Sequence, residues 1–209
     1  LLVLLEFKST YSEDQGEAWL NRTETVLLSE LGDALLLRPS TVRGAHDNLR
    51  DAISKSGWPS LTELRGKTLF VLHSSGSLRQ HYVDQFNPEE WTLFPDASGD
   101  ASLHFAAVHA VNDPEGSFDV IQSLVEAGHI VRTRADSNLV EGRNQDDSRF
   151  QNALASGAHF ISTDFPVAQG NIDYTVSIPE GTPSRCNPLW PEPCEATDIE
   201  DPRFINTCD

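Results

Sequence analysis

Basic residues are scarce in this chain of 209 residues, which has 15 lysines and arginines against 32 aspartates and glutamates. The formal net charge is −17. Nucleic-acid binding needs clustered lysines and arginines that contact phosphates, so this balance argues against it. It equally argues against electrostatic attachment to anionic membranes, although a local basic cluster can exist on an acidic surface.

Long apolar runs are also missing, because no stretch approaches the roughly 20 residues that a membrane span needs. The opening LLVLL could resemble the end of a signal peptide, but no basic segment precedes it and no small-residue cleavage site follows. We therefore interpret it as a strand buried on both faces, as in a parallel sheet. A core strand at this place raises the expectation that only part of a larger fold is present.

Two kinds of sequence motif are absent: those that bind nucleotides and the one that positions a catalytic serine. Neither a G-x-G-x-x-G motif nor a P-loop follows any predicted strand, so the usual signals for nucleotide binding are missing. Ser74, Ser75 and Ser77 lie in a loop without a nucleophile-elbow pattern, which gives a serine hydrolase little support.

Cysteines are few, and all three lie in the proline-rich C-terminal segment: Cys186, Cys194 and Cys208. Such a segment has little core of its own, so a Cys186–Cys194 disulfide that closes a small loop is favoured over free thiols. A zinc site has less support, since no CxxC or nearby histidine pair exists. Cys208 is left without a predicted partner. The sequon at Asn21 permits N-glycosylation and agrees with an extracellular setting.

Strands and helices alternate along most of the chain. After a polar loop, TETVLLSELGDALL has helical spacing with Thr23 or Thr25 as the expected N-cap. Further helices are predicted in AHDNLRDAISKSG, SFDVIQSLVEAG and DSRFQNALASGA. The predicted strands cover residues 2–8, 68–73, 103–109, 129–135 and 159–164. This alternation predicts right-handed βαβ units and an α/β fold with a parallel sheet.

Each predicted strand ends in a polar or charged residue. These residues are Glu6 and Lys8, His73, His109, Arg132 and Arg134, and Asp164. Five strands could form an open doubly wound sheet. However, the active sites of (βα)8 barrels lie at the carboxyl ends of the strands, so this pattern favours part of such a TIM barrel.

Glu6 and Lys8 are two positions apart and therefore point to the same face of their strand. A buried carboxylate needs a cation, so Glu6 either binds a hard metal ion such as Ca²⁺ or Mg²⁺ or forms an ion pair with Lys8. Arg132 and Arg134 share this spacing. Two guanidinium groups on one face suit a phosphate or carboxylate, but they can also pair with Asp136, Asp164 or Glu141.

The remaining candidates give weaker signals. A histidine beside an apolar strand usually has a structural role, and His129 and His159 lie at the starts of their strands, away from the expected active-site end. Asp164 either has a functional role, in which it orients one of the arginines or contacts the substrate, or caps the following turn.

Several stretches in order, from residue 2 to about residue 190, resemble the secreted calcium-dependent phosphatidylinositol-specific phospholipase C family. They are VLLEFK, GWPSLTELRGKTLFVL, AGHIVRTRAD, ALASGAHFISTDFPV and RCNP. This family belongs to the phosphodiesterase (βα)8 barrels, which include the glycerophosphodiester phosphodiesterases. The resemblance implies that residues 1–180 form about strands 4–8 of such a barrel and that 181–209 are a tail.

The resemblance also implies roles for single residues. Glu6 matches a glutamate that binds Ca²⁺, Lys8 would face the phosphate, and Arg132 and Arg134 would hold phosphate and inositol. His73 departs from the pattern, in which an aspartate follows LFVL, and we expect it at the substrate-binding rim. The two catalytic histidines, which act as base and acid, would lie upstream, so no catalytic residue is expected in this chain.

The sequence therefore predicts part of a secreted, Ca²⁺-dependent phosphodiesterase. Its partners would be a phosphatidylinositol headgroup at a membrane surface and the N-terminal half of the barrel. A glycerophosphodiester phosphodiesterase is one alternative. The other is a non-catalytic barrel that binds lipid headgroups or a protein.

Overall fold

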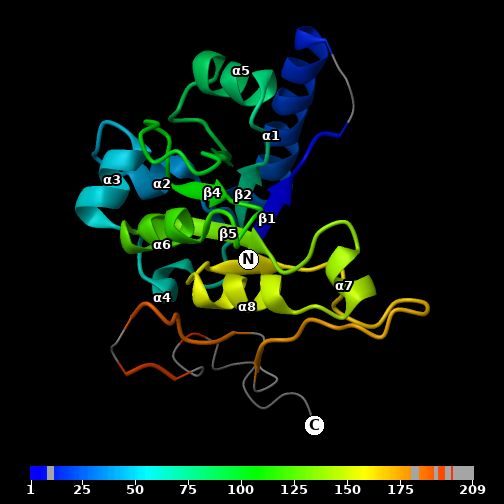
Figure 1. The fold of residues 1–209 in the computed structure, drawn as a ribbon. Helices are drawn as coiled ribbons and strands as arrows, with labels where there is room; N and C mark the ends of the chain where they lie inside the picture. The colour runs from blue at the N-terminus through cyan, green and yellow to red at the C-terminus, as the bar shows by residue number, and fades with distance from the viewer. Residues whose placement is uncertain (9–11, 180–183, 191–192, 196–198, 200–209) are drawn as a thin grey trace. The chain divides into compact units, whose positions relative to one another are not determined.

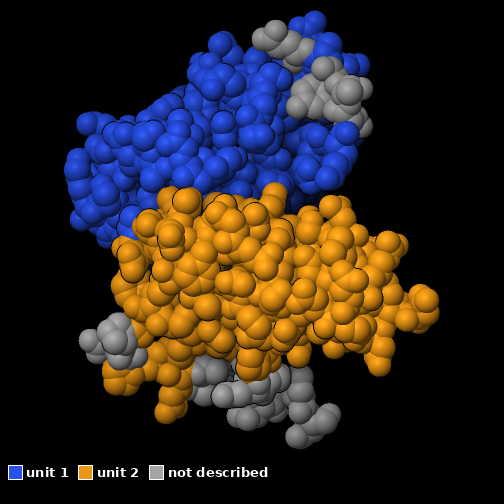
Figure 2. Space-filling model, in the orientation of Figure 1, with its two compact units in different colours: residues 1–110, 127–129 blue, residues 111–126, 130–209 orange. Residues whose placement is uncertain are grey.

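The chain is represented by a computed structural model, which describes residues 1–8, 12–179, 184–190, 193–195 and 199. Two compact units make up the chain. Unit 1 comprises residues 1–110 and 127–129, and unit 2 comprises residues 111–126 and 130–209 (Figure 2). Cys208 lies outside the described residues.

Unit 1 contains four strands and five helices among its described residues (Figure 1). They are β1 (Leu2–Leu5), α1 (Glu13–Leu35), α2 (Pro39–Arg43), α3 (Leu49–Ser56), α4 (Leu61–Leu64), β2 (Leu69–Leu72), α5 (Ser77–Gln85), β3 (Leu93–Pro95) and β4 (Val108–Ala110).

Three parallel strands form the sheet of unit 1, in the order β1-β2-β3. Leu5 lies opposite Leu72, and Leu72 lies opposite Pro95. A parallel bridge between Asp96 and Val108 joins the end of β3 to β4. Because all these strands run in the same direction, their carboxyl ends meet at one edge of the sheet.

The first strand is less buried than predicted. Every residue of β1 is half-buried, whereas Val71 and Leu72 of β2 and Leu93 and Phe94 of β3 are fully buried. In the described part of the chain, β1 is an edge strand with a neighbour on one side only. The sheet is therefore open there, and its closure into a (βα)8 barrel stays a prediction.

Two strand predictions for unit 1 were wrong. The strand expected at 103–109 is limited to β4, because the segment before it forms turns, with the amide of Ala106 bonded to the carbonyl of Leu103. β3 was missed, because Pro95 and the short length of LFP concealed a buried strand.

Helix α1 begins earlier than the predicted cap at Thr23 or Thr25. Ser12 is its N-cap, and a capping box joins Ser12 to Gln15. The polar stretch before Thr23 is therefore helical, and it lacks a strong apolar pattern because Gly16 and Leu20 are its buried positions. The backbone leaves helical geometry at Gly32, whose φ of 58° favours glycine.

Unit 2 contains α6 (Phe118–Glu126), β5 (Ile130–Arg134), α7 (Val140–Asn144), α8 (Ser148–Ala155) and β6 (Phe160–Ser162). Strands β5 and β6 are parallel, with Arg132 opposite Phe160, which confirms the predicted strands with shorter bounds. Helices α6 and α8 were also predicted. Val111, Ile121, Leu124, Val125 and Val131 form a buried cluster against which Ala158 and Leu189 pack.

Among the helices of the described ranges, none has both the length and the apolar character that crossing a bilayer requires.

Candidate functional site

A row of polar residues follows the three strands of the unit 1 sheet. Continuing the register by one residue beyond each strand places Glu6, after β1, beside His73, after β2, and His73 beside Asp96, after β3. Backbone bonds support this register, since the amide of His73 donates to Leu5 and the amide of Asp96 donates to Leu72. Partners in a parallel register point to the same face, so these side chains share one face of the carboxyl edge.

Asp96 is the buried centre of this row, with only 1% of its surface exposed. Its Oδ2 lies 2.8 Å from Nδ1 of His73, and its Oδ1 accepts the amide hydrogens of Ser98 and Ala110. Burial alone raises the pKa of Asp96, but the bonds from His73 and the two amides outweigh it and hold the pKa below its ordinary value. Asp96 is therefore an ionised acceptor near neutral pH.

Arg79 of α5 fixes the backbone around this carboxylate. Its Nη1 donates to the carbonyl oxygen of Asp96 at 2.7 Å, and its guanidinium lies 5.6 Å from the ring centroid of Phe105. The sequence interpretation missed both Asp96 and Arg79. Once LFP is recognised as a strand, the aspartate that directly follows it is the signal that could have identified this position.

Glu6 and Lys8 form an ion pair of 2.7 Å, as one of the two sequence interpretations expected. Both side chains are well exposed, at 43% for Glu6 and 78% for Lys8. A groove of about 380 Å³ is lined by these two residues and by Phe7, Trp19, Arg22 and Thr23. The rings of Phe7 and Trp19 stack with 6.0 Å between their centroids.

The described residues do not by themselves form a Ca²⁺ site. Ca²⁺ takes about six to eight oxygen ligands. No group of three histidine, cysteine, aspartate or glutamate side chains lies close enough to hold a metal ion within the ranges that the structure describes. Glu6 can supply one carboxylate, which is already paired with Lys8. We therefore derive no chemical step through a metal ion from these residues.

Arg132 and Arg134 in unit 2 lie on the same face of β5. Arg132 donates to the side-chain oxygens of Asn112 and Ser162, which hold its guanidinium from the segment before α6 and from β6. Arg134 forms an ion pair of 3.1 Å with Asp164, directly after β6. Asp164 therefore contacts one of the predicted arginines, as one of its two interpretations expected.

His109 and His129 of unit 1 form a buried pair with 3.2 Å between Nε2 of His109 and Nδ1 of His129. The amide of Gly99 donates to Nδ1 of His109, so a neutral His109 carries its hydrogen on Nε2 and donates it to His129. Burial first, and then the neighbouring His129, lower the pKa of His109 to about 4. These histidines are thus structural.

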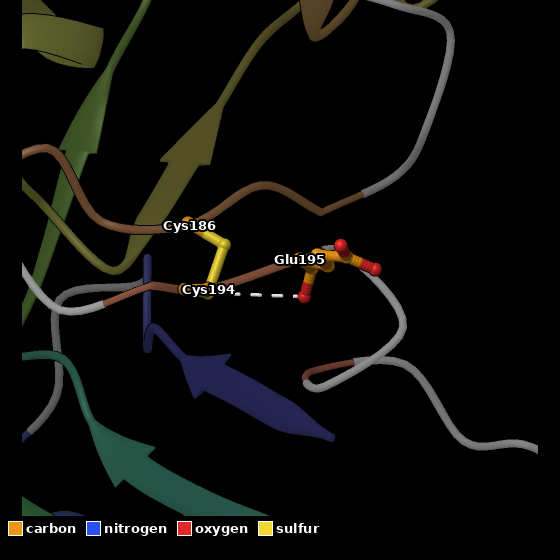
Figure 3. The surroundings of a disulfide bond; sticks show 3 residues. All are labelled: Cys186, Cys194 and Glu195. Carbon is orange, nitrogen blue, oxygen red and sulfur yellow. Dashed lines mark hydrogen bonds between the residues drawn. A yellow bond between two sulfur atoms is a disulfide. The ribbon is translucent and has the colours of Figure 1, made fainter.

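The predicted disulfide is confirmed, and it joins Cys186 to Cys194 in unit 2 (Figure 3). The contact drawn from Cys194 to the carbonyl oxygen of Glu195 measures 3.7 Å, and a disulfide sulfur has no hydrogen to donate there. The same segment is attached to α8 and the turn after it. Arg185 donates to the carbonyl of Leu154 and Asn187 donates to that of Gly157.

The structure thus places the predicted site residues in two sets. Glu6, Lys8 and His73 belong to unit 1, and Arg132 and Arg134 belong to unit 2. Glu6 and His73 directly follow β1 and β2, and Arg132 and Arg134 lie on β5, close to the predicted places. The strand predicted at residues 2–8 ends at Leu5, however, so Lys8 lies beyond it.

Comparison with solved structures gives related folds at low sequence identity. A Ca²⁺-dependent phosphatidylinositol-specific phospholipase C from Streptomyces antibioticus aligns with a TM-score of 0.56 and 19% identity, over 78% of this chain and 63% of that one. A calcium-dependent phosphoinositol-specific phospholipase C from a Pseudomonas species aligns with a TM-score of 0.55 and 15% identity, over 78% and 57%. The chain thus spans less than two thirds of either protein.

Comparison with known sequences identifies the family. No curated protein matches the chain. The model of the family described as Ca²⁺-dependent phosphoinositide phospholipase C matches residues 3–188. This match covers most of the sequence, and the chain therefore belongs to the Ca²⁺-dependent phosphoinositide phospholipase C family.

Proposed function

We propose that this chain supplies headgroup-binding residues to a Ca²⁺-dependent phosphodiesterase of the phospholipase C type. The complete enzyme would cleave phosphatidylinositol into diacylglycerol and a cyclic or open-chain phosphate ester of inositol. The family match over residues 3–188 is the observation that carries this proposal. One of the similar structures is described as a myoinositol complex, which supports an inositol headgroup as the ligand.

Three cationic residues have chemistry that suits the phosphate. Arg132 and Arg134 present planar guanidinium groups that can bind phosphate oxygens in a bidentate manner, and Asn112 and Ser162 orient Arg132. Lys8 presents an exposed ammonium group beside the groove of unit 1. We assign phosphate binding to these residues and headgroup binding to His73.

Glu6 is the candidate metal ligand within the chain. It would contribute one carboxylate, and the other oxygen ligands would have to come from outside the described residues. His109 and His129 are poor candidates for acid–base catalysis, because they are buried and paired with each other. We expect the catalytic histidines to lie outside this chain and the chain alone to be inactive.

The disulfide favours an oxidising compartment, so we propose an extracellular protein that meets its phospholipid at a membrane surface. None of the described helices is long and apolar enough to cross a membrane.

Calorimetry with inositol 1-phosphate tests the binding role of the chain. We expect Arg132→Gln to weaken binding about tenfold, since a hydrogen bond to a charged group contributes about 1.5–3 kcal/mol. Arg143→Gln, at an exposed position of α7, is the matched control and should bind like the unchanged chain. Equal affinities for both variants would contradict the assignment of Arg132.

Turnover assays separate the related activities. With Ca²⁺ and phosphatidylinositol vesicles, we expect no cleavage by the chain alone, and robust turnover would contradict the proposal. Glycerophosphoinositol serves as the parallel substrate. Binding of glycerophosphoinositol but not of phosphatidylinositol would favour a glycerophosphodiester phosphodiesterase instead.

A further inference from the structure

His73 and Asp96 form a hydrogen-bonded dyad at the carboxyl edge of the unit 1 sheet. Phosphate binding by Lys8, Arg132 and Arg134 gives this dyad no role. Asp96 is ionised and its carboxylate only accepts hydrogen bonds, so Nδ1 of His73 must carry the hydrogen of their 2.8 Å bond. In the neutral imidazole, Nε2 then holds a lone pair. The carboxylate thus determines which ring nitrogen is an acceptor.

This acceptor nitrogen is accessible. The side chain of His73 is 20% exposed. Its Nε2 is not among the buried atoms that lack a partner, and it forms no hydrogen bond with any residue that the structure describes. Nε2 is therefore not fully buried, and it lies at the same edge of the sheet as Glu6.

The dyad is also held rigidly. The Oδ1 atom of Asp96 receives the amide hydrogens of Ser98 at 2.7 Å and Ala110 at 2.9 Å, while Oδ2 receives His73. Arg79 holds the carbonyl of the same residue. These bonds hold the carboxylate of Asp96 in place, and through it they fix the position and the tautomer of the half-buried ring of His73.

A lone pair at Nε2 selects the ligand group that it meets. It accepts a hydrogen bond from a hydroxyl group, and it repels an anionic phosphate oxygen, which has no hydrogen to donate. We propose that Asp96 is a positioning residue that presents Nε2 of His73 as the acceptor for a hydroxyl group of a polyol headgroup. This inference rests on the proposed function, because it takes the headgroup to be a polyol.

The tautomer of His73 can be read from ¹⁵N spectra of the chain at pH 8 without any activity. We expect the hydrogen on Nδ1. In the variant Asp96→Asn, the two backbone amides keep the amide oxygen at the position of Oδ1, so the new NH₂ group faces His73. It can only donate to Nδ1, and the hydrogen of the ring should move to Nε2.

Asp100→Asn is the matched control for this experiment. Asp100 precedes Ser102 in the same loop and accepts hydrogen bonds from it, but it does not contact His73. This control removes the same charge and should leave the tautomer unchanged. A ring hydrogen on Nε2 in the unchanged chain, or no change of tautomer in Asp96→Asn, would overturn the proposal.

Titration with myo-inositol tests the ligand. We expect the ring signals of His73 to shift and His73→Phe to weaken binding about three- to tenfold, which corresponds to the loss of one hydrogen bond. In a parallel titration with inositol 1-phosphate, shifts at Lys8 without any at His73 would overturn this inference and leave the proposed function standing. If neither residue responds, the inositol-binding role of this edge is overturned together with the inference.

Discussion

The pair of His109 and His129 is the residue-scale feature with the clearest dependence on pH. His109 is fully buried, and Asp96 and Asp100 only partly offset the effects of burial and of His129 on its pKa. The pKa of His129 and that of His159 are also lowered, in both cases by burial. Each of these rings is thus harder to protonate in the folded chain than in the unfolded chain.

We predict that the chain loses stability in mild acid. His109 has a pKa of about 4 when folded and 6.5 ordinarily, so the unfolded state binds more protons between these values. The stability that is linked to neutral His109 is fully present above pH 6.5 and is lost as the pH falls toward 4. Urea unfolding at pH 7 and pH 4 should differ by about 3 kcal/mol from His109 alone.

The variant His109→Asn should flatten this dependence, because asparagine does not titrate and can still accept the amide hydrogen of Gly99. His104→Asn, at an exposed position, is the control and should leave the dependence as it is. An unchanged pH profile in His109→Asn would show that other groups are responsible.

The positions of single residues along the strands could be predicted from the sequence, but their side-chain partners could not. The positions of Glu6, His73 and Arg134 at strand ends could be predicted, because apolar runs mark the strands. The bond of His73 to Asp96 could not be predicted, since it joins residues 23 positions apart through a strand that was missed. The partners Asn112 and Ser162 of Arg132 are likewise set by strand pairing.

At the scale of elements, α1 is attached to the rest of unit 1 through a polar cluster. Oε1 of Glu24 accepts hydrogen bonds from the hydroxyl of buried Tyr82 at 2.5 Å and from the amide of Thr92 at 3.1 Å. Burial, and then the charge of Glu24, raise the pKa of Tyr82 well above its ordinary value, so its hydroxyl remains a donor. One carboxylate thus joins α1 to α5 and β3.

We predict that Glu24→Ala lowers the free energy of unfolding by about 2 kcal/mol, because it leaves the buried hydroxyl of Tyr82 without its acceptor. Glu30→Ala, at an exposed position of the same helix, should change stability by less than about 0.5 kcal/mol. Urea unfolding of both variants is the measurement. Equal losses would indicate that the removal of any carboxylate from this helix, rather than this cluster, determines the effect.

Elements were predicted unevenly, for physical reasons. Helices α3, α6 and α8 have apolar faces with a period near 3.6 and could be identified directly. The first half of α1 could not, because much of that surface is exposed and its apolar pattern is weak. Its capping box was present in the sequence, and that local signal would have extended the helix.

At the scale of the whole chain, the family assignment has a consequence for metal binding. The family is Ca²⁺-dependent, whereas the described residues offer Glu6 as a single carboxylate paired with Lys8. We predict that calorimetry on the chain alone detects no Ca²⁺ binding with a Kd below about 1 mM, the weak limit of extracellular calcium modules.

Glu6→Gln is the informative variant for this measurement, and it should leave the titration unchanged. A Kd below about 0.1 mM that disappears in Glu6→Gln would show that the chain assembles further oxygen ligands around Glu6. Asp14→Asn, at an exposed position of α1, controls for the general loss of negative charge.

Trp19, which stacks on Phe7, places a fluorescent indole ring in the groove of unit 1. Trp19 lines the same groove as Glu6 and Lys8, so its indole is adjacent to the charges that a headgroup would neutralise. Indole emission shifts in wavelength and intensity with local charge and hydration. Replacing the other three tryptophans, at positions 58, 91 and 190, with phenylalanine would leave a chain whose fluorescence reports on this groove alone.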